Sequence, residues 1–496
     1  MSPNRIYLTG NVRALGIHFV AARGTGKSRA LGRIFLPQDA CAGVPTIVID
    51  PIGETINNFI SKIAELPQDI QQDIWPRVVY IDMAGRNGFV TPFPLYYRLH
   101  IESYYQVAQR FLEVVKWSDP KLVDAPVRGW GPAWRLGSHA GTILYAAGYQ
   151  ISEMEHLLTQ TKSWEPLFQT LEHTIPEVKN AIAFMRTYAD NSREYKATQS
   201  DALRIKTNVF TIDPDTLAMF GAKTPMVRID EVIKKKQIVL IDVGGVADIE
   251  RRRFMLMWLI SYVTTYIKAR GPGHDKPPLS LVIDEFSLLT GSQSESHVSF
   301  SEELDQLVNV YSRSHRLWLT VAGQSIAQYN EATQRALLSL GTQIFGAVPD
   351  MASAKHIAES FATLDPTKRK LETLYSQTFQ PLQEQVHVIA QRLRGLARFT
   401  FLMRLALEEG TVADTFQQVS LREVDKDMWV KPEVVEKVKT ILQKRSALPV
   451  GPILADIASR IPQSIPSHSD TSSRENKRPN QKSGTLPPED PNLVDF

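Results

Sequence analysis

Residues 17 to 31, IHFVAARGTGKSRAL, decide the fold of this chain. They read as a short apolar strand, a turn that contains glycine, and the start of a helix. Residues 21 to 28, AARGTGKS, match the phosphate-binding loop pattern, with alanine in place of its first glycine. Gly24 and Gly26 would let the backbone approach a ligand closely. The stretch therefore predicts a phosphate-binding turn, and the alternative is an ordinary strand-to-helix turn with an exposed lysine.

The chemistry of such a loop is electrostatic. Backbone N–H groups of the turn and of the following helix N-terminus converge on a phosphate chain. Lys27 adds a mobile cation, and Ser28 offers a hydroxyl to Mg²⁺. We expect ATP and Mg²⁺ as ligands of the following consecutive residues: Ala22, Arg23, Gly24, Thr25, Gly26, Lys27 and Ser28.

Composition limits the class of protein. The chain has 496 residues, 43% of them hydrophobic, which is enough for a large core and more than one structural unit. Its 56 Lys plus Arg and 53 Asp plus Glu give a net charge of +3, so any contact with nucleic acid must be local. A single cysteine, Cys41, excludes an internal disulfide framework, fits a reducing compartment, and is expected to be a small buried residue.

No segment predicts export or membrane insertion. Residues 1 to 16 lack the apolar core of a secretory signal, so we expect a cytoplasmic protein. The most membrane-like run, FMLMWLISYVTTYI at residues 254 to 267, has only 14 residues and is too short to span a bilayer. It predicts a buried helix.

The order of apolar runs predicts a doubly wound α/β fold. VPTIVID (44 to 50) and RVVYIDM (77 to 83) read as strands, with a helical pattern over 54 to 65 between them. Strands that are apolar on both faces suit the centre of a parallel sheet. Asp50 and Asp82 end these strands, at the edge where ligands gather in such sheets.

Residues 96 to 225 differ from the rest of the chain in their pattern of apolar residues. They show long amphipathic helical patterns with no convincing strand, so we expect an all-helical subdomain inserted into the sheet domain. Its aromatic residues could stack on nucleic-acid bases, but at helical spacing such residues more often belong to the core. The tryptophans concerned are Trp117, Trp130, Trp134 and Trp164.

The strand pattern resumes after this insertion. Apolar runs predict further strands over residues 237 to 243, 279 to 285, 316 to 324 and 342 to 348. Residues 386 to 404 alternate apolar and polar around Arg394-Gly395, which predicts a two-stranded ribbon. Two helices should follow, up to about residue 461. The remainder is rich in Ser, Pro and charge and predicts disorder. Its last residues, PNLVDF, could dock on a partner, although such ends are more often plain tails.

These patterns divide the chain into five parts. The predicted boundaries are a first part of the phosphate-loop ATPase domain (1–95), the helical insertion (96–225), the second part of the ATPase domain (226–405), a C-terminal helical extension (406–462) and a disordered tail (463–496).

A hydrolase needs a metal ligand and an acid beside the phosphate loop. Residues 281 to 285, LVIDE, place two carboxylates at the end of a strand. Asp284 would hold Mg²⁺ through water, and Glu285 would polarise the attacking water. The alternative is a strand that merely ends in solvated acids.

Two further residues complete the predicted site. Gln324 ends the strand RLWLTVAGQ, where its amide could bind the γ-phosphate or the attacking water; it could instead cap the next helix. Arg313 and Arg316 lie in YSRSHRLW. We choose Arg313 as an arginine finger that reaches a neighbouring subunit's γ-phosphate, and the alternative is a solvated surface residue.

Together these motifs resemble the HerA/FtsK superfamily of ring-forming ATPases, and most closely the TraG/TraD-type coupling proteins of conjugative type IV secretion. The resemblance covers roughly residues 15 to 405, with AARGTGKS, VIDPIGE, TPFPL, the helical insertion, LSLVIDEF, SRSHRLW and AGQS in the family's order. It implies a RecA-like P-loop NTPase sheet. It also implies nucleotide binding at Gly24, Gly26, Lys27 and Ser28, Mg²⁺ and hydrolysis at Asp284 and Glu285, and sensing at Gln324.

The sequence departs from this family in three places. Coupling proteins usually begin with transmembrane helices and HerA-type translocases with a β-barrel, and the residues before Ala21 leave room for neither. Alanine at position 21 replaces the first loop glycine, and Pro92-Phe93-Pro94 replaces the usual Asn-Pro. We therefore expect any attachment to the inner face of the membrane to be peripheral and through a partner.

The resemblance implies an ATP-driven DNA translocase that works as a homo-hexamer, with a secretion channel, a relaxase or a nuclease as partner. Sequence-independent contacts to the DNA backbone could come from local basic groups, although such groups more often form a solvated face: Lys234 to Lys236, Arg251 to Arg253 and Lys368 to Lys370. Two alternatives remain. One is a HerA-like ATPase that partners a nuclease in DNA processing or phage defence, and the other is an ATP-dependent adaptor that recruits protein cargo.

Overall fold

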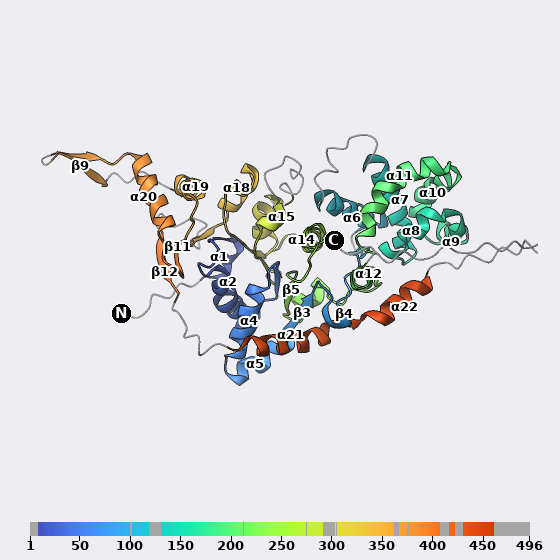
Figure 1. The fold of residues 1–496 in the computed structure, drawn as a ribbon, viewed down its shortest axis with the longest axis horizontal. Helices are drawn as coiled ribbons and strands as arrows, with labels where there is room; N and C mark the ends of the chain where they lie inside the picture. The colour runs from blue at the N-terminus through green and yellow to red at the C-terminus, as the bar shows by residue number, and fades with distance from the viewer. Residues whose placement is uncertain are drawn as a thin grey trace, which may run out of the picture. The chain divides into compact units, whose positions relative to one another are not determined.

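A nine-stranded sheet forms the centre of the described structure, a computed structural model (Figure 1). The strand order is β12-β11-β8-β1-β7-β6-β2-β5-β3. The strands from β8 to β3 pair in parallel, whereas β11 and β12 pair antiparallel at one edge. The strands are β1 Ile17–Val20, β2 Thr46–Asp50, β3 Val78–Asp82, β5 Ile238–Asp242, β6 Leu279–Ile283, β7 Leu317–Gly323, β8 Thr342–Phe345, β11 Thr400–Arg404 and β12 Gln417–Ser420.

The structure describes most of the first 460 residues. The described ranges are 8–99, 102–118, 130–211, 213–273, 275–290, 303, 305–361, 367–373, 376–406, 416–421 and 430–460. The tail predicted at 463–496 therefore lies outside them. Within the described ranges, no helix is both long enough and apolar enough to cross a membrane.

Both faces of the sheet are covered, which explains why its strands are apolar on both sides. Along β2, Ile47 and Ile49 belong to one hydrophobic cluster, and Val48 between them belongs to the other. This is the alternation that the pleat of a strand imposes. Helix α4 (Glu54–Ala64) packs into the second cluster, and α14 (Ile249–Arg270) packs into the first. The prediction of a parallel α/β sheet, and of a buried helix at 254 to 267, is confirmed.

The segment between β4 (Phe89–Val90) and β5 consists, in its described residues, of helices and turns. Trp130 and Trp164 are buried in the core, and Trp117 and Trp134 pack against it, so the core interpretation of these aromatics is confirmed. The helices are α6 Tyr104–Ser118, α7 Trp130–Ala146, α8 Met154–Thr159, α9 Glu165–Thr174, α10 Lys179–Asp190, α11 Arg193–Asn208, α12 Pro214–Gly221 and α13 Ile229–Lys234.

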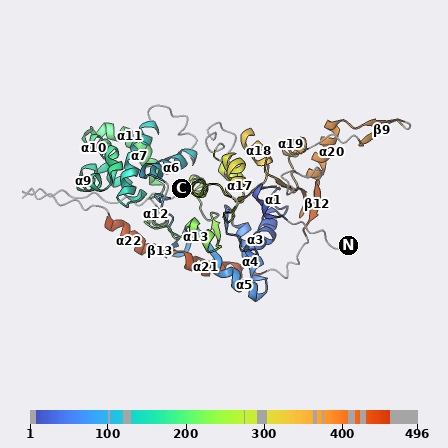
Figure 2. The same cartoon turned by 180° about the vertical axis from the view of Figure 1, so that it is seen from behind.

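Two helices follow the sheet, as expected: α21 (Pro432–Ser446) and α22 (Val450–Arg460). Seen from behind, α21 runs along α4 and α5 (Gln68–Ile74), and α22 continues to α12 (Figure 2). Ser446 at the end of α21 donates a hydrogen bond of 2.6 Å to the backbone carbonyl of Tyr80 in β3. The C-terminal helices thus contact both the sheet and the helical segment.

Two expectations are wrong. Residues 386 to 404 do not form a ribbon, because α20 (Leu382–Arg394) occupies the first part and only β11 is a strand. Val386, Ala390 and Leu393 recur at helical spacing and are all buried, so the apparent alternation was one face of a helix. A ribbon does occur nearby, between β9 (Arg369–Thr373) and β10 (Ser376–Phe379). Cys41, expected to be buried, is exposed at the end of α3 (Leu36–Cys41).

The register of the parallel strands aligns their carboxyl ends. Asp50 of β2 pairs with Asp242 of β5, which pairs with Asp82 of β3. Because parallel strands all end at the same edge, the residues that follow β1, β6 and β7 also meet there. The candidate site lies at this edge.

Candidate functional site

The loop after β1 is shaped by two glycines with positive φ. Gly24 has φ of +79° and Gly26 has φ of +110°, a backbone region that side chains rarely adopt. A Cβ on Gly26 would lie 2.3 Å from Cδ1 of Phe399, whereas a Cβ on Gly24 would meet no heavy atom within 4 Å. The loop is therefore tightly packed against Phe399 at Gly26, whereas the space beside Gly24 is open to a ligand.

Local hydrogen bonds fix the path of this loop. The Thr25 hydroxyl donates to the Ala22 carbonyl at 2.6 Å, and the Ala22 N–H donates to Ala347 at 2.9 Å. The Phe399 N–H donates to the Thr25 carbonyl at 2.9 Å. Helix α2 (Lys27–Ala30) begins directly after the turn, so the first N–H groups of a helix face the opening.

Lys27 contacts both predicted acidic residues. Its Nζ is hydrogen-bonded to Asp284 and lies 2.8 Å from Oε1 of Glu285. Burial would by itself lower the pKa of Lys27, but the charges of Asp284 and Glu285 outweigh it and raise that pKa. The lysine is therefore a cation whose charge is already matched by two carboxylates.

Asp284 is buried at the end of β6 and is surrounded by hydroxyl donors. Ser28 Oγ lies 3.2 Å from its Oδ2, and Thr55 Oγ1 donates to the same oxygen at 2.6 Å. The sequence prediction missed Thr55, which follows the DPIGE turn after β2. Its position after an Asp-terminated strand was the available signal.

Glu285 has an unusual backbone conformation that directs its side chain. Its φ is +48°, which is uncommon for a residue with a Cβ and indicates strain held by its surroundings. Gln324 Nε2 donates to Oε2 of Glu285 at 2.9 Å, so the two predicted residues meet. Burial, together with the charges of Glu285 and Asp284, raises the pKa of Tyr329. The carboxylate of Glu285 is thus held between Lys27 and Gln324.

Asp50 lies behind Asp284 and helps to shape the turn. Burial, together with the charge of Asp284, raises the pKa of Asp50 to about 6. Its carboxylate accepts hydrogen bonds of 2.8 to 3.0 Å from the N–H groups of Ile52, Gly53 and Ile56 at the start of α4. Asp50 therefore organises the turn rather than the pocket.

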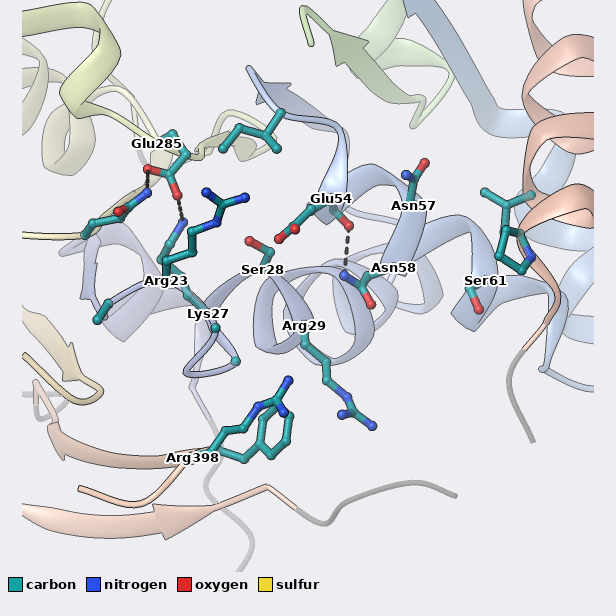
Figure 3. Close-up of a pocket in the computed structure, with 18 of the residues that line it drawn as sticks. Arg23, Lys27, Ser28, Arg29, Glu54, Asn57, Asn58, Ser61, Glu285 and Arg398 are labelled. Carbon is teal, nitrogen blue, oxygen red and sulfur yellow. Dashed lines mark hydrogen bonds and ion pairs between the residues drawn. The ribbon is translucent and has the colours of Figure 1, made fainter. Parts of the chain in front are cut away.

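A pocket of about 570 Å³ opens beside these groups (Figure 3). The phosphate loop, Glu285 and Gln324 line one end. The other end was missed by sequence reasoning, because it is built by residues far apart in the chain. It is lined by Asn57, Asn58 and Ser61 of α4, Arg398 and Phe399 before β11, and Pro432, Val435 and Glu436 of α21.

The donor set fits Mg²⁺ in the way phosphate-loop sites use it. Among the described residues, no group of three or more His, Cys, Asp or Glu side chains could hold a metal by itself. Mg²⁺ needs only one or two protein oxygens when substrate phosphates supply others. Ser28 Oγ and the carboxylate of Asp284 face each other at 3.2 Å and would serve as those oxygens.

Other predicted residues lie away from this pocket. Arg313 belongs to α17 (Ser312–Ser314), which precedes β7 and so lies at the opposite edge of the sheet; its side chain is outside the described structure. Asp82 is hydrogen-bonded to Arg86 Nε at 2.6 Å and does not line the pocket.

The three basic stretches proposed for DNA each contain an ion pair within the chain. Lys235 pairs with Glu231 at 2.6 Å, Arg251 pairs with Asp213 at 2.9 Å, and Lys370 pairs with Glu384. Part of their positive charge is thus already matched.

The mostly parallel nine-stranded sheet, with the glycine-containing loop after β1, has a RecA-like fold. Among solved structures, the unbound bacterial conjugative coupling protein TrwB matches with a TM-score of 0.50 at 16% identity, over 83% of this chain and 86% of that one. The plasmid coupling protein TrwB in complex with the non-hydrolysable GTP analogue GDPNP also has a TM-score of 0.50 at 16% identity, over 85% and 89% of the two chains. No family model and no curated protein matches the sequence. The resemblance to coupling proteins is therefore confirmed at the level of the fold.

Proposed function

We propose that this protein binds and hydrolyses ATP in the pocket between the phosphate loop and the ends of β6 and β7. The observation that carries the proposal is the contact of Lys27 with Asp284 and Glu285. Lys27 and Asp284 are 257 residues apart in the sequence, yet they meet beside the open side of the loop. A loop that can cradle phosphates, a hydroxyl, a metal-binding carboxylate and an oriented glutamate are the parts that hydrolysis of a phosphoanhydride needs.

Each residue has a role that follows from its contacts. The loop N–H groups and Lys27 would hold the phosphates, and Lys27 would exchange its carboxylate partners for phosphate oxygens as the nucleotide enters. Glu285, still held by Gln324, would then accept the proton of the attacking water. Mg²⁺, held by Ser28 and Asp284, would supply positive charge to the phosphate oxygens.

We further propose that hydrolysis drives DNA transfer in a type IV secretion-related assembly. The fold shared with TrwB, a conjugative coupling protein, supports this role. The working form would be a homo-hexamer, as the family resemblance implies, and Arg313, which lies at the opposite edge of the sheet from its own pocket, would act on a neighbouring subunit's site. The ring would be cytoplasmic and bound to the membrane through a partner, with the domain boundaries predicted above.

The hydrolysis proposal is tested with Glu285→Gln. We expect the variant to bind a fluorescent ATP analogue as the unmodified protein does, and to hydrolyse ATP roughly 100-fold more slowly, because the proton acceptor is lost. Glu177→Gln, at an exposed glutamate of the helical segment, is the matched control and should hydrolyse ATP normally. Equal rates for the two variants would contradict the role of Glu285.

The DNA proposal is tested separately, by measuring ATP turnover with and without DNA at several salt concentrations. Non-specific contacts to phosphates predict binding that weakens steeply as salt rises. If DNA neither binds nor stimulates turnover when the partner proteins are present, translocation is the wrong function. Cargo recruitment that persists in Glu285→Gln would then favour the adaptor, and activity only with a nuclease would favour the DNA-processing alternative.

A further inference from the structure

Arg23 belongs to the predicted phosphate loop, but the roles above use only the backbone of that loop and leave the Arg23 side chain without a role. It lies in the turn between β1 and α2, its side chain is exposed, and it lines the pocket. Figure 3 shows its guanidinium extending from the loop into the pocket, on the side of Ser28 and Glu285. Within the described structure, Arg23 makes no ion pair and donates no side-chain hydrogen bond to another residue.

The charge balance at this end of the pocket favours a second cation. Lys27 is in contact with Asp284 and Glu285, and Glu54 also lines the pocket. A triphosphate is polyanionic, and the charge on its γ-phosphoryl oxygens must be stabilised during hydrolysis. Lys27 alone must therefore face two carboxylates and the phosphates together. Arg23 is placed to supply the additional positive charge.

The other pocket arginines are held elsewhere. The guanidinium groups of Arg29 and Arg398 each lie 4.7 Å from the ring centre of Phe399, on the side of the loop away from Glu285 (Figure 3). Arg23 precedes Lys27 by four residues in the same loop. The hydrogen bonds of Thr25 to Ala22 keep this turn closed, so Arg23 faces the pocket of its own subunit.

We propose that Arg23 binds the γ-phosphate of the nucleotide in its own subunit and stabilises the transition state of hydrolysis. This inference rests on the proposed ATPase function. In the reaction, the water oxygen bonds to the γ-phosphorus while the bond to the β–γ bridging oxygen breaks. The water proton passes to Glu285, and ADP and phosphate leave. The guanidinium gives up no proton and acts through charge and paired N–H donors.

The first test compares Arg23→Ala and Arg23→Lys with the unmodified protein. We expect Arg23→Ala to lower kcat roughly 100-fold, as the loss of such a donor does in other enzymes. The kcat of Arg23→Lys should lie between those of Arg23→Ala and the unmodified protein, because lysine keeps the charge but lacks the paired donors. Fluorescent ATP should bind Arg23→Ala about 10-fold more weakly, and fluorescent ADP should bind normally, since a single charge-assisted contact to the γ-phosphate is lost.

Arg193→Ala is the matched control, because Arg193 is an exposed arginine at the start of α11, within the helical segment. It should hydrolyse ATP normally. Normal hydrolysis by Arg23→Ala would overturn the inference while leaving the proposed function intact. An unmodified protein that neither binds nor hydrolyses ATP would overturn both.

A mixing experiment separates action in the same subunit from action on a neighbour. Arg23→Ala and Lys27→Ala chains, carrying different affinity tags, are combined, and copurification of the tags shows whether they associate. No pocket in the mixture then contains both residues, so we expect no recovery of activity. Recovery in mixed assemblies would show that Arg23 serves a neighbouring site and would overturn the inference. If the chains do not associate, low activity of Arg23→Ala alone supports it.

Discussion

Two buried lysine–aspartate pairs lie at the same edge of the sheet, and only one belongs to the pocket. Lys27 contacts Asp284 after β6, and Lys439 of α21 lies 3.4 Å from Asp242 at the end of β5. Asp242 also accepts a hydrogen bond of 2.8 Å from the Tyr80 hydroxyl and one of 3.0 Å from the Gly244 N–H. Its oxygens are therefore satisfied by fixed neighbours.

The pocket pair differs in how its partners are held. Lys27 belongs to a glycine-containing loop and Glu285 faces an open pocket, so a ligand can compete for the lysine. The Lys439 pair joins a helix to the sheet and lines no described pocket. A buried ion pair is therefore weak evidence for chemistry by itself. The two lysine–aspartate pairs differ in whether a ligand can reach the lysine.

Removing the pocket lysine should have the largest effect. In Lys27→Ala we expect ATP hydrolysis to fall by roughly 1000-fold or more, because the loop loses its phosphate-binding cation. Hydrolysis and nucleotide binding are measured together, with circular dichroism to confirm folding. Hydrolysis at the normal rate would show that the two pairs do not differ in the way described.

Replacing Lys439, the lysine that lines no described pocket, should lower the stability of the fold. We expect Lys439→Met to lose about 2 kcal/mol of unfolding free energy, because the buried Asp242 loses one of its two cations and keeps only Arg86, at 3.5 Å. Urea denaturation gives the value, and ATP turnover per folded molecule should stay within about twofold. A large loss of turnover with unchanged stability would reverse the assignment of the two pairs.

A smaller effect is expected from Gln324, which only orients Glu285, the second acidic partner of Lys27. Gln324→Ala removes the hydrogen bond to Glu285, so we expect kcat to fall by about 10-fold with little change in ATP affinity. Steady-state kinetics provide the measurement. Gln324→Glu would place like charges together and should be worse than alanine; the opposite order would contradict an orienting role.

The smallest effect concerns a buried polar residue that should affect stability alone. Burial lowers the pKa of His18 from 6.5 to about 4, against the opposing effect of its hydrogen bond to Gln343. The contribution of neutral His18 to the free energy of unfolding is present above pH 6.5 and is lost as pH falls toward 4, because the unfolded chain takes up the proton first. Relative to His18→Gln, we expect the unmodified protein to lose about 1 kcal/mol between pH 7 and pH 5.5. If the difference in unfolding free energy between the unmodified protein and His18→Gln stays constant from pH 7 to pH 5.5, His18 does not titrate in this way.

Much of the pocket could be predicted because each of its parts is a short motif that can be recognised by itself. The loop, Asp284, Glu285 and Gln324 each follow a short apolar run, and the ends of parallel strands necessarily meet. The place of Thr55 after an Asp-terminated strand indicated that it lies near the site, but its contact with Asp284 could not be read from spacing, since that contact depends on how α4 is placed. Arg398 and Val435 could not be predicted either, because the packing that brings them to the loop leaves no periodic signal.

The error at residues 386 to 404 has a different origin. The stretch is short enough for a helical face and a strand alternation to place apolar residues at similar positions. Tertiary context decides between them, since α20 packs against α19 (Met351–Phe361) and leaves only Thr400–Arg404 to pair with β8.

The position of α21 has a mechanical consequence. One end of the helix lines the pocket at Val435 and Glu436, and its middle is anchored to the sheet by Lys439. After a short connection, α22 reaches the helical segment, where Arg460 donates a hydrogen bond of 2.7 Å to the Gly221 carbonyl. The two helices form a strut from pocket to helical segment. We expect closure of the pocket to pull on that segment through this strut, together with the strands β5 and β3 to which Lys439 and Ser446 anchor it.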